Sequence, residues 1–201
     1  MSVSMAERFE KSFYSKTTLQ VVLCLFQMEN SGLHFLGMTD LKNYRQLPIL
    51  DNHGCFACGH TNSAGLRMEF FTDEETVYSN LTIPPHLCGW SNLTHGGIIS
   101  TVLDEVMSWA AIYLLKKIIL TKTISIDFIK PVFVGTELTA EGKILEVINE
   151  REAVMQGIIR NSETICAKSK GTFALLTLDT AMRLKVVDEK ALKDIEPLFN
   201  A

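Results

Sequence analysis

The chain has 201 residues, of which 47% are hydrophobic and 21% are charged, and its formal net charge is −4. This is enough apolar material for one globular core, and it excludes a long disordered chain or a collagen-like repeat. The slightly acidic balance provides neither a basic surface for nucleic acid nor a polybasic membrane anchor, so we expect neither partner.

The cysteines and the apolar runs predict a cytoplasmic protein. Five cysteines are an odd number in a chain too long to need disulfides, so reduced thiols are expected. The apolar run 19–28 is shorter than the roughly 20 residues that a membrane span requires. Glu7 and Glu10 interrupt the basic region that a signal peptide would need.

Three regions follow one another along the chain. Residues 1–50 are irregular, and we expect an appendage with one or two helices. Residues 51–180 show regular patterning and form the main predicted domain. Residues 181–201 form a tail with a possible short helix over 188–198, capped by Asp188.

The main domain is predicted to be α+β. Alternating or β-branched segments predict strands, and a long apolar segment predicts one helix at 96–115. The expected strands cover residues 66–70, 77–83, 121–129, 136–148, 153–159 and 164–178. Short connections between the later strands require antiparallel pairing, so the helix should pack on an antiparallel sheet.

The two sides of the predicted helix differ in character. At 100° per residue, one side carries the apolar residues that should pack on the sheet: Ile99, Val102, Leu103, Val106, Trp109, Ala110 and Tyr113. The other side carries small residues around one charge: Gly97, Ser100, Asp104, Ser108 and Ala111. Such a face allows close approach by a second helix or a ligand, although an ordinary exposed Asp is the alternative.

The predicted helix begins at His95-Gly96-Gly97. Free backbone N–H groups at a helix start, together with the positive end of the helix dipole, suit a developing oxyanion. Two glycines would let a carbonyl group approach this backbone closely, although a plain glycine-rich loop has the same composition.

Three segments in this order resemble a known family. The stretch 95–105, HGGIISTVLDE, resembles the HGG…LDE signature of hotdog-fold acyl-CoA thioesterases of the PaaI-like group. CFACG at 55–59, followed by Asn62 and Gly65-Leu66, resembles the opening motif of one branch of that group. DFIKP at 127–131 resembles the end of the strand after the helix. The resemblance covers about residues 53–178.

The resemblance implies a hotdog fold, in which an antiparallel sheet wraps around the long helix, and hydrolysis of acyl-CoA without a cofactor. By the same resemblance, Asp104 is the general base or nucleophile, and the Gly96 N–H polarises the thioester carbonyl. His95 positions the site, and Thr121 orients the water or the carboxylate. We expect Gly97, Asn92, Ser100 and Ser108 to contact substrate. Gly89 occupies a position where the family often has Asn or Gln, for which Ser91 or Asn92 could substitute.

The family implies homodimers or homotetramers, and helix geometry independently favours a site at the dimer interface. Gly96 and Asp104 are eight residues apart, which is about 12 Å along one helix. One thioester cannot lie within hydrogen-bonding reach of both groups. If both act on it, they must come from different chains.

Two further clusters have alternative interpretations. Cys55 and Cys58, together with His53, His60 and Cys88, could form a zinc site, but no second Cys pair at zinc-ribbon spacing exists. We therefore expect packing cysteines and no metal. The lysines at 116, 117 and 122 should form a solvated helix end, or else meet the phosphates of CoA.

Two other functions remain open. A hotdog hydratase or dehydratase would need an acid/base pair, but the His and Asp of the motif lie more than two helical turns apart. A non-catalytic acyl-CoA-binding protein would have little reason to place the Asp104 carboxylate near an anionic product.

Overall fold

The computed structural model describes residues 39–50 and 53–200, all within the compact unit Gly37–Ala201. The helices expected before residue 39 lie outside the described residues. The end of the expected appendage is part of the main domain, because β1 (Arg45–Gln46) pairs with β2 (Phe71–Thr72). Leu47 and Leu50 are buried in the core.

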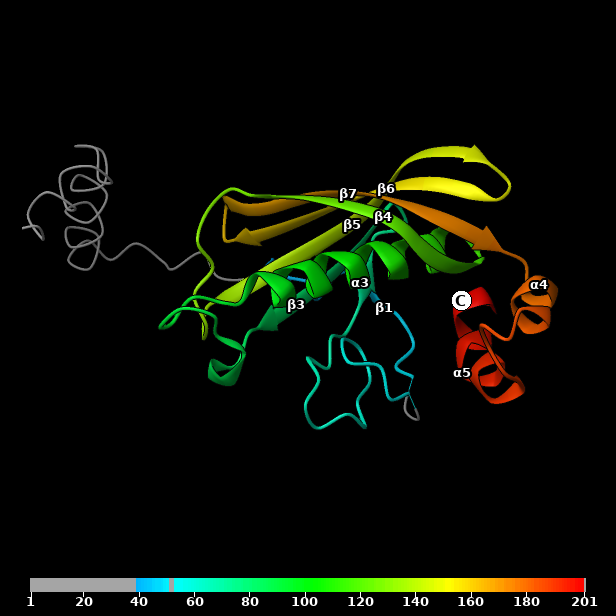
Figure 1. Cartoon of the computed structure of the whole chain (residues 1–201), viewed down its shortest axis with the longest axis horizontal. Helices are drawn as coiled ribbons and strands as arrows, with labels where there is room; N and C mark the ends of the chain where they lie inside the picture. The colour runs from blue at the N-terminus through cyan, green and yellow to red at the C-terminus, as the bar shows by residue number, and fades with distance from the viewer. Residues whose placement is uncertain (1–38, 51–52, 201) are drawn as a thin grey trace, which may run out of the picture. The chain divides into compact units, whose positions relative to one another are not determined.

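The strands form one seven-stranded sheet in the order β1-β2-β3-β5-β6-β7-β4, and all neighbouring strands are antiparallel (Figure 1). The longer strands are β3 (Thr76–Thr82), β4 (Ile118–Phe128), β5 (Glu137–Asn149), β6 (Glu152–Asn161) and β7 (Thr164–Leu176). A short 3-10 helix, η1 (Pro85–Leu87), follows β3. The predicted antiparallel sheet is thus confirmed.

The strand predicted at 66–70 is wrong, because only Phe71–Thr72 joins the sheet as β2. The residues before β2 hydrogen-bond to irregular segments instead. Met68 donates its N–H to the carbonyl of Ala57, and the carbonyl of Phe70 accepts the N–H of Leu47. Alternation in the sequence indicated burial correctly, since Met68 and Phe70 are 2% exposed, but it did not indicate the pairing partner.

The long helix α3 (Gly96–Leu115) has the predicted bounds, and it packs mainly on β5 and β6 (Figure 1). All seven residues predicted to face the sheet are buried. Gly142 on β5 and Gly157 on β6 form a cross-strand pair beneath the helix. A Cβ atom at Gly142 would lie 2.3 Å from the carbonyl oxygen of Val106, so the helix rests directly on glycine backbone.

Helix α3 is also long and apolar enough to cross a membrane by length and composition. The core helix of a soluble protein passes the same test. In this structure half of its most apolar stretch is buried inside the chain.

The connection from β3 through α3 carries the chain to the far edge of the sheet, where β4 pairs only with β7. Within the described part of the chain, the other edge of β4 has no partner strand. Most side chains of β4 are exposed on both faces. A long strand is therefore presented along one edge of the domain.

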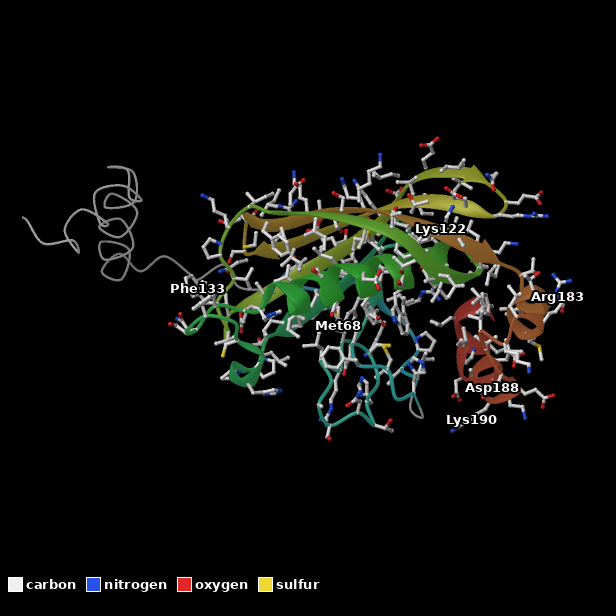
Figure 2. The ribbon with its side chains drawn as sticks, viewed as in Figure 1. Met68, Lys122, Phe133, Arg183, Asp188 and Lys190 are labelled. Carbon is white, nitrogen blue, oxygen red and sulfur yellow. The ribbon has the colours of Figure 1, made fainter. Side chains whose placement is uncertain are left out.

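Two helices end the chain, α4 (Leu178–Arg183) and α5 (Glu189–Asn200). The predicted cap is confirmed, because Asp188 Oδ1 accepts the N–H of Ala191 at 2.7 Å. Helix α4 was not predicted. The strand expected to reach Leu178 ends at Leu176, because the side chain of Thr177 caps α4. Figure 2 shows Arg183 on α4, with Asp188 and Lys190 at the start of α5.

Candidate active site

The start of α3 offers one free backbone donor. His95 is the N-cap residue, and its Nδ1 accepts the N–H of Gly97 at 2.9 Å. The N–H of Gly96 makes no hydrogen bond to any described residue. Gly96 therefore keeps the donor predicted for it, His95 shapes the helix start, and the N–H of Gly97 is already used within the chain.

A mainly apolar cavity of about 310 Å³ lies beside this helix start. Gly96, Ile99, Phe128 and Val132 are among the residues that line it, and Lys130 also borders it. The ring of Phe128 lies 3.8 Å from the place where a Cβ atom of Gly96 would be. An apolar group bound in this cavity would lie next to the free N–H of Gly96.

Asp104 lies in the third turn of α3 and is held by β4. The hydroxyl of Thr121 donates to Asp104 Oδ1 at 2.8 Å. Burial raises the pKa of Asp104 above its ordinary value, and the hydrogen bond from Thr121 opposes this rise. The structure thus brings together the two residues that the resemblance associates, a carboxylate and a hydroxyl that orients it.

Strand β4 runs alongside α3 and connects the two ends of the candidate site. Thr121 of β4 hydrogen-bonds to Asp104, and the ring of Phe128 at the end of β4 lies beside Gly96. Gly96 and Asp104 are eight positions apart, which is about 12 Å along the helix. One chain therefore does not bring the donor and the carboxylate to a common point, but both lie along the same free sheet edge.

Only part of the predicted small-residue face is accessible. Ser108 is 9% exposed and Ala111 is fully buried in the core, so the prediction that the open face extends this far is wrong. The last turns of α3 are covered on both sides. Ser100 remains partly exposed, but its hydroxyl donates to the carbonyl of Gly96 at 2.9 Å. Asn92 is exposed, and its carbonyl accepts the N–H of Val134.

Gly89 fits closely against the helix start. A Cβ atom at Gly89 would lie 3.3 Å from His95 Cα and 3.4 Å from its Cδ2. A residue with a side chain at this position would require His95 to shift by a few tenths of an ångström. Ser91 and Asn92, the predicted substitutes for an amide, are both exposed.

Of the three lysines considered for CoA phosphates, two interact within the chain. Lys116 Nζ donates to the carbonyl of Leu198 at 2.8 Å and lies over the ring of Tyr113. Lys122, on β4, forms an ion pair with Glu152 on β6 (Figure 2). Sequence reasoning missed Lys130, the cation that borders the cavity; it belongs to the DFIKP motif.

A second polar cluster is formed by Cys55, Glu105 and Trp109. Cys55 Sγ is 3.9 Å from both carboxylate oxygens of Glu105, and Trp109 Nε1 donates to Glu105 Oε1 at 3.0 Å. Burial, with the neighbouring Cys55, raises the pKa of Glu105 to about 7. A hydrogen bond from the thiol of Cys58 lowers the pKa of Cys55 to about 5. Nothing in the sequence linked Glu105 to these cysteines.

Comparison with known proteins identifies the fold. Residues 92–166 match the family model of the thioesterase superfamily. This match includes both ends of the candidate site. No curated protein sequence matches the chain significantly.

Solved structures agree with this assignment. A thioesterase superfamily protein, RHA08564, is 19% identical with a TM-score of 0.56, and the match covers 79% of this chain and 77% of that one. Thioesterase HI1161 from Haemophilus influenzae is 19% identical with a TM-score of 0.52, covering 60% and 86%. The PaaI protein of E. coli is 18% identical with a TM-score of 0.50, covering 55% and 80%. The predicted hotdog fold is confirmed, and residues 92–166 resemble the thioesterase superfamily.

Proposed function

We propose that this chain, whose residues 92–166 belong to the thioesterase superfamily, hydrolyses the thioester bond of an acyl-CoA. The observation that carries the proposal is the pairing of Asp104 with Thr121. Asp104 is half-buried, and no cationic side chain among the described residues pairs with it. Burying an unpaired carboxylate costs free energy, and such carboxylates gather at functional sites. The hydroxyl of Thr121 donates to this carboxylate and orients it.

Asp104 can act in two ways. As a general base, its carboxylate takes a proton from water while the water oxygen attacks the thioester carbonyl carbon. As a nucleophile, the carboxylate attacks that carbon itself, and water then hydrolyses the resulting anhydride. In both routes the C–S bond breaks, the CoA sulfur leaves as a thiolate that takes up a proton, and the acid is released. Neither route requires a redox cofactor.

The free N–H of Gly96 supplies the other half of the chemistry. A backbone donor at a helix N-terminus stabilises the negative charge that develops on the carbonyl oxygen. The adjacent cavity, lined by Ile99, Phe128 and Val132, suits an apolar acyl or pantetheine segment. Lys130 at its border suits an anionic group of the substrate.

We propose that each site is shared between two chains of a homodimer, which could pair further into a tetramer. Strand β4 has one unpaired edge within the described residues, and a long apolar edge strand tends to pair with another chain. Exposed hydrophobic residues lie along it and just beyond it: Leu120, Ile124, Phe128 and Ile129. A two-fold axis at this edge would bring Asp104 of one chain toward Gly96 of the other.

A panel of acyl-CoA thioesters tests the proposal. The purified chain is incubated with short, long and aryl acyl-CoAs, and release of free CoA is followed with a thiol reagent while the free acid is quantified. We expect at least one substrate to be cleaved with kcat/KM of about 10⁴ M⁻¹s⁻¹ or more, with acid and CoA in equal amounts. The Asp104→Asn variant, prepared in the same way, reports contaminating activity.

Two other outcomes would contradict the proposal. Tight binding of acyl-CoA without release of CoA would identify a binding or regulatory protein. Loss of the conjugated double bond of an enoyl-CoA, without cleavage of its thioester, would identify a hydratase.

A further inference from the structure

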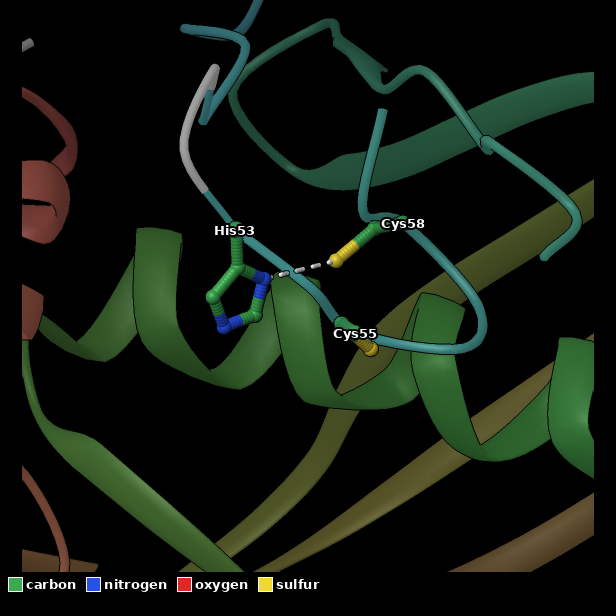
Figure 3. Close-up of side chains that lie close together, drawn as sticks. All are labelled: His53, Cys55 and Cys58. Atoms are coloured by element: carbon green, nitrogen blue, oxygen red, sulfur yellow. Dashed lines mark hydrogen bonds between the residues drawn. The ribbon is translucent and has the colours of Figure 1, made fainter. Parts of the chain in front are cut away.

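We propose that His53, Cys55, Cys58 and Glu105 bind one zinc ion, which fixes the loop 53–65 to helix α3. Sequence spacing alone led us to expect no metal here. Three of these residues place one potential ligand atom each within 4.8 Å of the others. Figure 3 shows His53, Cys55 and Cys58 close together beside α3, with the sulfur of Cys58 directed at the imidazole of His53.

The distances are close to those of a zinc site. Zn–S bonds of about 2.3 Å and Zn–N bonds of about 2.0–2.1 Å in a tetrahedron place neighbouring ligand atoms roughly 3.5–3.8 Å apart. Cys58 Sγ lies 3.7 Å from His53 Nδ1, and Cys55 Sγ lies 3.9 Å from the Glu105 oxygens. Glu105 lies outside the group of three whose ligand atoms are all within 4.8 Å of one another, so its carboxylate would have to move toward His53 and Cys58 to complete the tetrahedron. Two thiolates, an imidazole and a carboxylate are a donor set that zinc accepts.

The loop backbone is arranged to support such a site. The N–H of Ala57 points at Cys55 Sγ at 3.4 Å, an outer contact that stabilises a metal-bound thiolate. Gly59 closes the turn, because a Cβ there would lie 2.3 Å from the carbonyl oxygen of His53. The hydroxyl of Thr61 donates to that same carbonyl. The loop thus holds the first and last ligands of the His-x-Cys-x-x-Cys segment together.

Charge balance also favours a cation. Glu105 is half-buried, and no Lys or Arg side chain among the described residues pairs with it. It lies against two cysteines that would bind metal as thiolates. A divalent ion would compensate this concentration of negative groups, which is otherwise costly away from water.

Four protein ligands leave no open position for a substrate, so the site is structural. Residues 53–65 contain turns but no helix or strand, and their backbone hydrogen bonds join them to one another and to residues 50, 66 and 68 just outside the loop. Three ligands come from this loop, and the fourth comes from α3, directly after Asp104. Zinc would therefore anchor the irregular loop to the helix that carries the proposed catalytic carboxylate.

The metal content of the full chain tests the proposal independently of activity. The protein is expressed with added zinc, purified with a reductant and without chelator, and analysed by mass spectrometry of metals. We expect about one zinc per chain. Cys55→Ser and Cys58→Ser should retain less than about one fifth of it, whereas the matched variants Cys88→Ser and His86→Asn, at exposed positions outside the cluster, should retain all of it.

A second measurement uses only the wild-type chain, so it does not depend on whether the variants fold. Alkylation of Cys55 and Cys58 should be slow with zinc bound and fast after chelation, while exposed Cys88 reacts in both states. Replacement by Co²⁺ should give sulfur-to-metal charge transfer and the strong visible bands of tetrahedral coordination. At a zinc concentration 100 times Kd, Tm should rise by about 5–10 °C.

Glu105→Gln tests the fourth ligand. An amide is a poor zinc ligand, so we expect Kd for zinc to rise at least about tenfold and the visible Co²⁺ bands to change. An unchanged Kd and spectrum would remove Glu105 from the site. Zinc-free wild-type protein with alkylation that does not respond to zinc, or a Cys55–Cys58 disulfide in the presence of zinc, would overturn the whole proposal.

Discussion

At the scale of single residues, the account depends on Asp104. Asp104→Asn keeps the shape of the side chain but removes the base or nucleophile, so we expect kcat for acyl-CoA hydrolysis to fall at least about 100-fold. The matched control is Asp127→Asn, an exposed acid on β4. Equal losses in both variants, or wild-type turnover by folded Asp104→Asn, would remove Asp104 from the mechanism.

Thr121 is a positioning residue that acts through Asp104. Thr121→Val removes the hydroxyl but keeps the branched shape, and a lost hydrogen bond to a charged group is worth about 1.5–3 kcal/mol, or about 10–100-fold in kcat. We expect KM to stay nearly constant, and Thr121→Ser to restore most of the rate. A Val variant that changes KM alone, or a Ser variant as slow as Val, would indicate a different role.

At the scale of elements, the close contact between α3 and the sheet sets the position of the site. Gly142→Ala would place a Cβ against the carbonyl of Val106, which belongs to helix backbone and cannot rotate away. We expect a loss of about 2 kcal/mol or more in unfolding free energy and a Tm lower by about 4–8 °C. Gly54→Ala, where a Cβ meets nothing within 4 Å, should change Tm little. Similar Tm values for the two variants would mean that the contact is not tight.

The elements also show how far the sequence predicts the fold. Helix α3 was predicted to the residue, because its apolar spacing is regular and its bounds carry glycines and a loop. The prediction of a strand at 66–70 was wrong. The alternation of apolar and polar residues indicates which side chains are buried, whereas strand pairing depends on residues distant in sequence, such as Leu47. The prediction of an open helix face at Ser108 and Ala111 was wrong for a related reason, because small side chains suit a core as well as an open face.

The candidate functional residues were also only partly predictable from the sequence. Gly96, Asp104 and Thr121 could be proposed from the sequence because they lie within one continuous region of the chain, and their roles stay predictions. The zinc proposal could not be completed from sequence. The segment containing His53 and Cys58 was visible, but the remaining ligand, Glu105, follows nearly fifty residues later on α3. Only the folded chain places that carboxylate beside Cys55.

At the scale of the whole molecule, we expect a dimer that pairs through β4. Leu120→Lys with Ile124→Lys places charges on this edge, and two copies would bring like charges together, so the dimer should dissociate to monomers in sedimentation experiments. Activity per chain should fall in parallel. Leu184→Lys changes an exposed apolar residue just after α4 and should leave the dimer intact. A doubly substituted chain that remains dimeric would place the interface elsewhere.

The claim that each active site combines two chains is tested most directly by mixed dimers. One chain carries Asp104→Asn and the other carries Gly96→Pro. Proline removes the free N–H and suits this first helical position, because His95 before it has φ −62° and ψ 135°. Gly96→Ala, which keeps the N–H, controls for the added side chain.

In the mixed dimer, one site carries both lesions and the other carries neither. Differently tagged chains are co-expressed, the heterodimer is isolated through both tags, and the initial rate of CoA release is measured against both mutant homodimers. The shared site predicts nearly inactive homodimers and a heterodimer with up to about half of the wild-type activity per dimer. A pure heterodimer no more active than the two homodimers would contradict the shared site and place the catalytic groups within one chain.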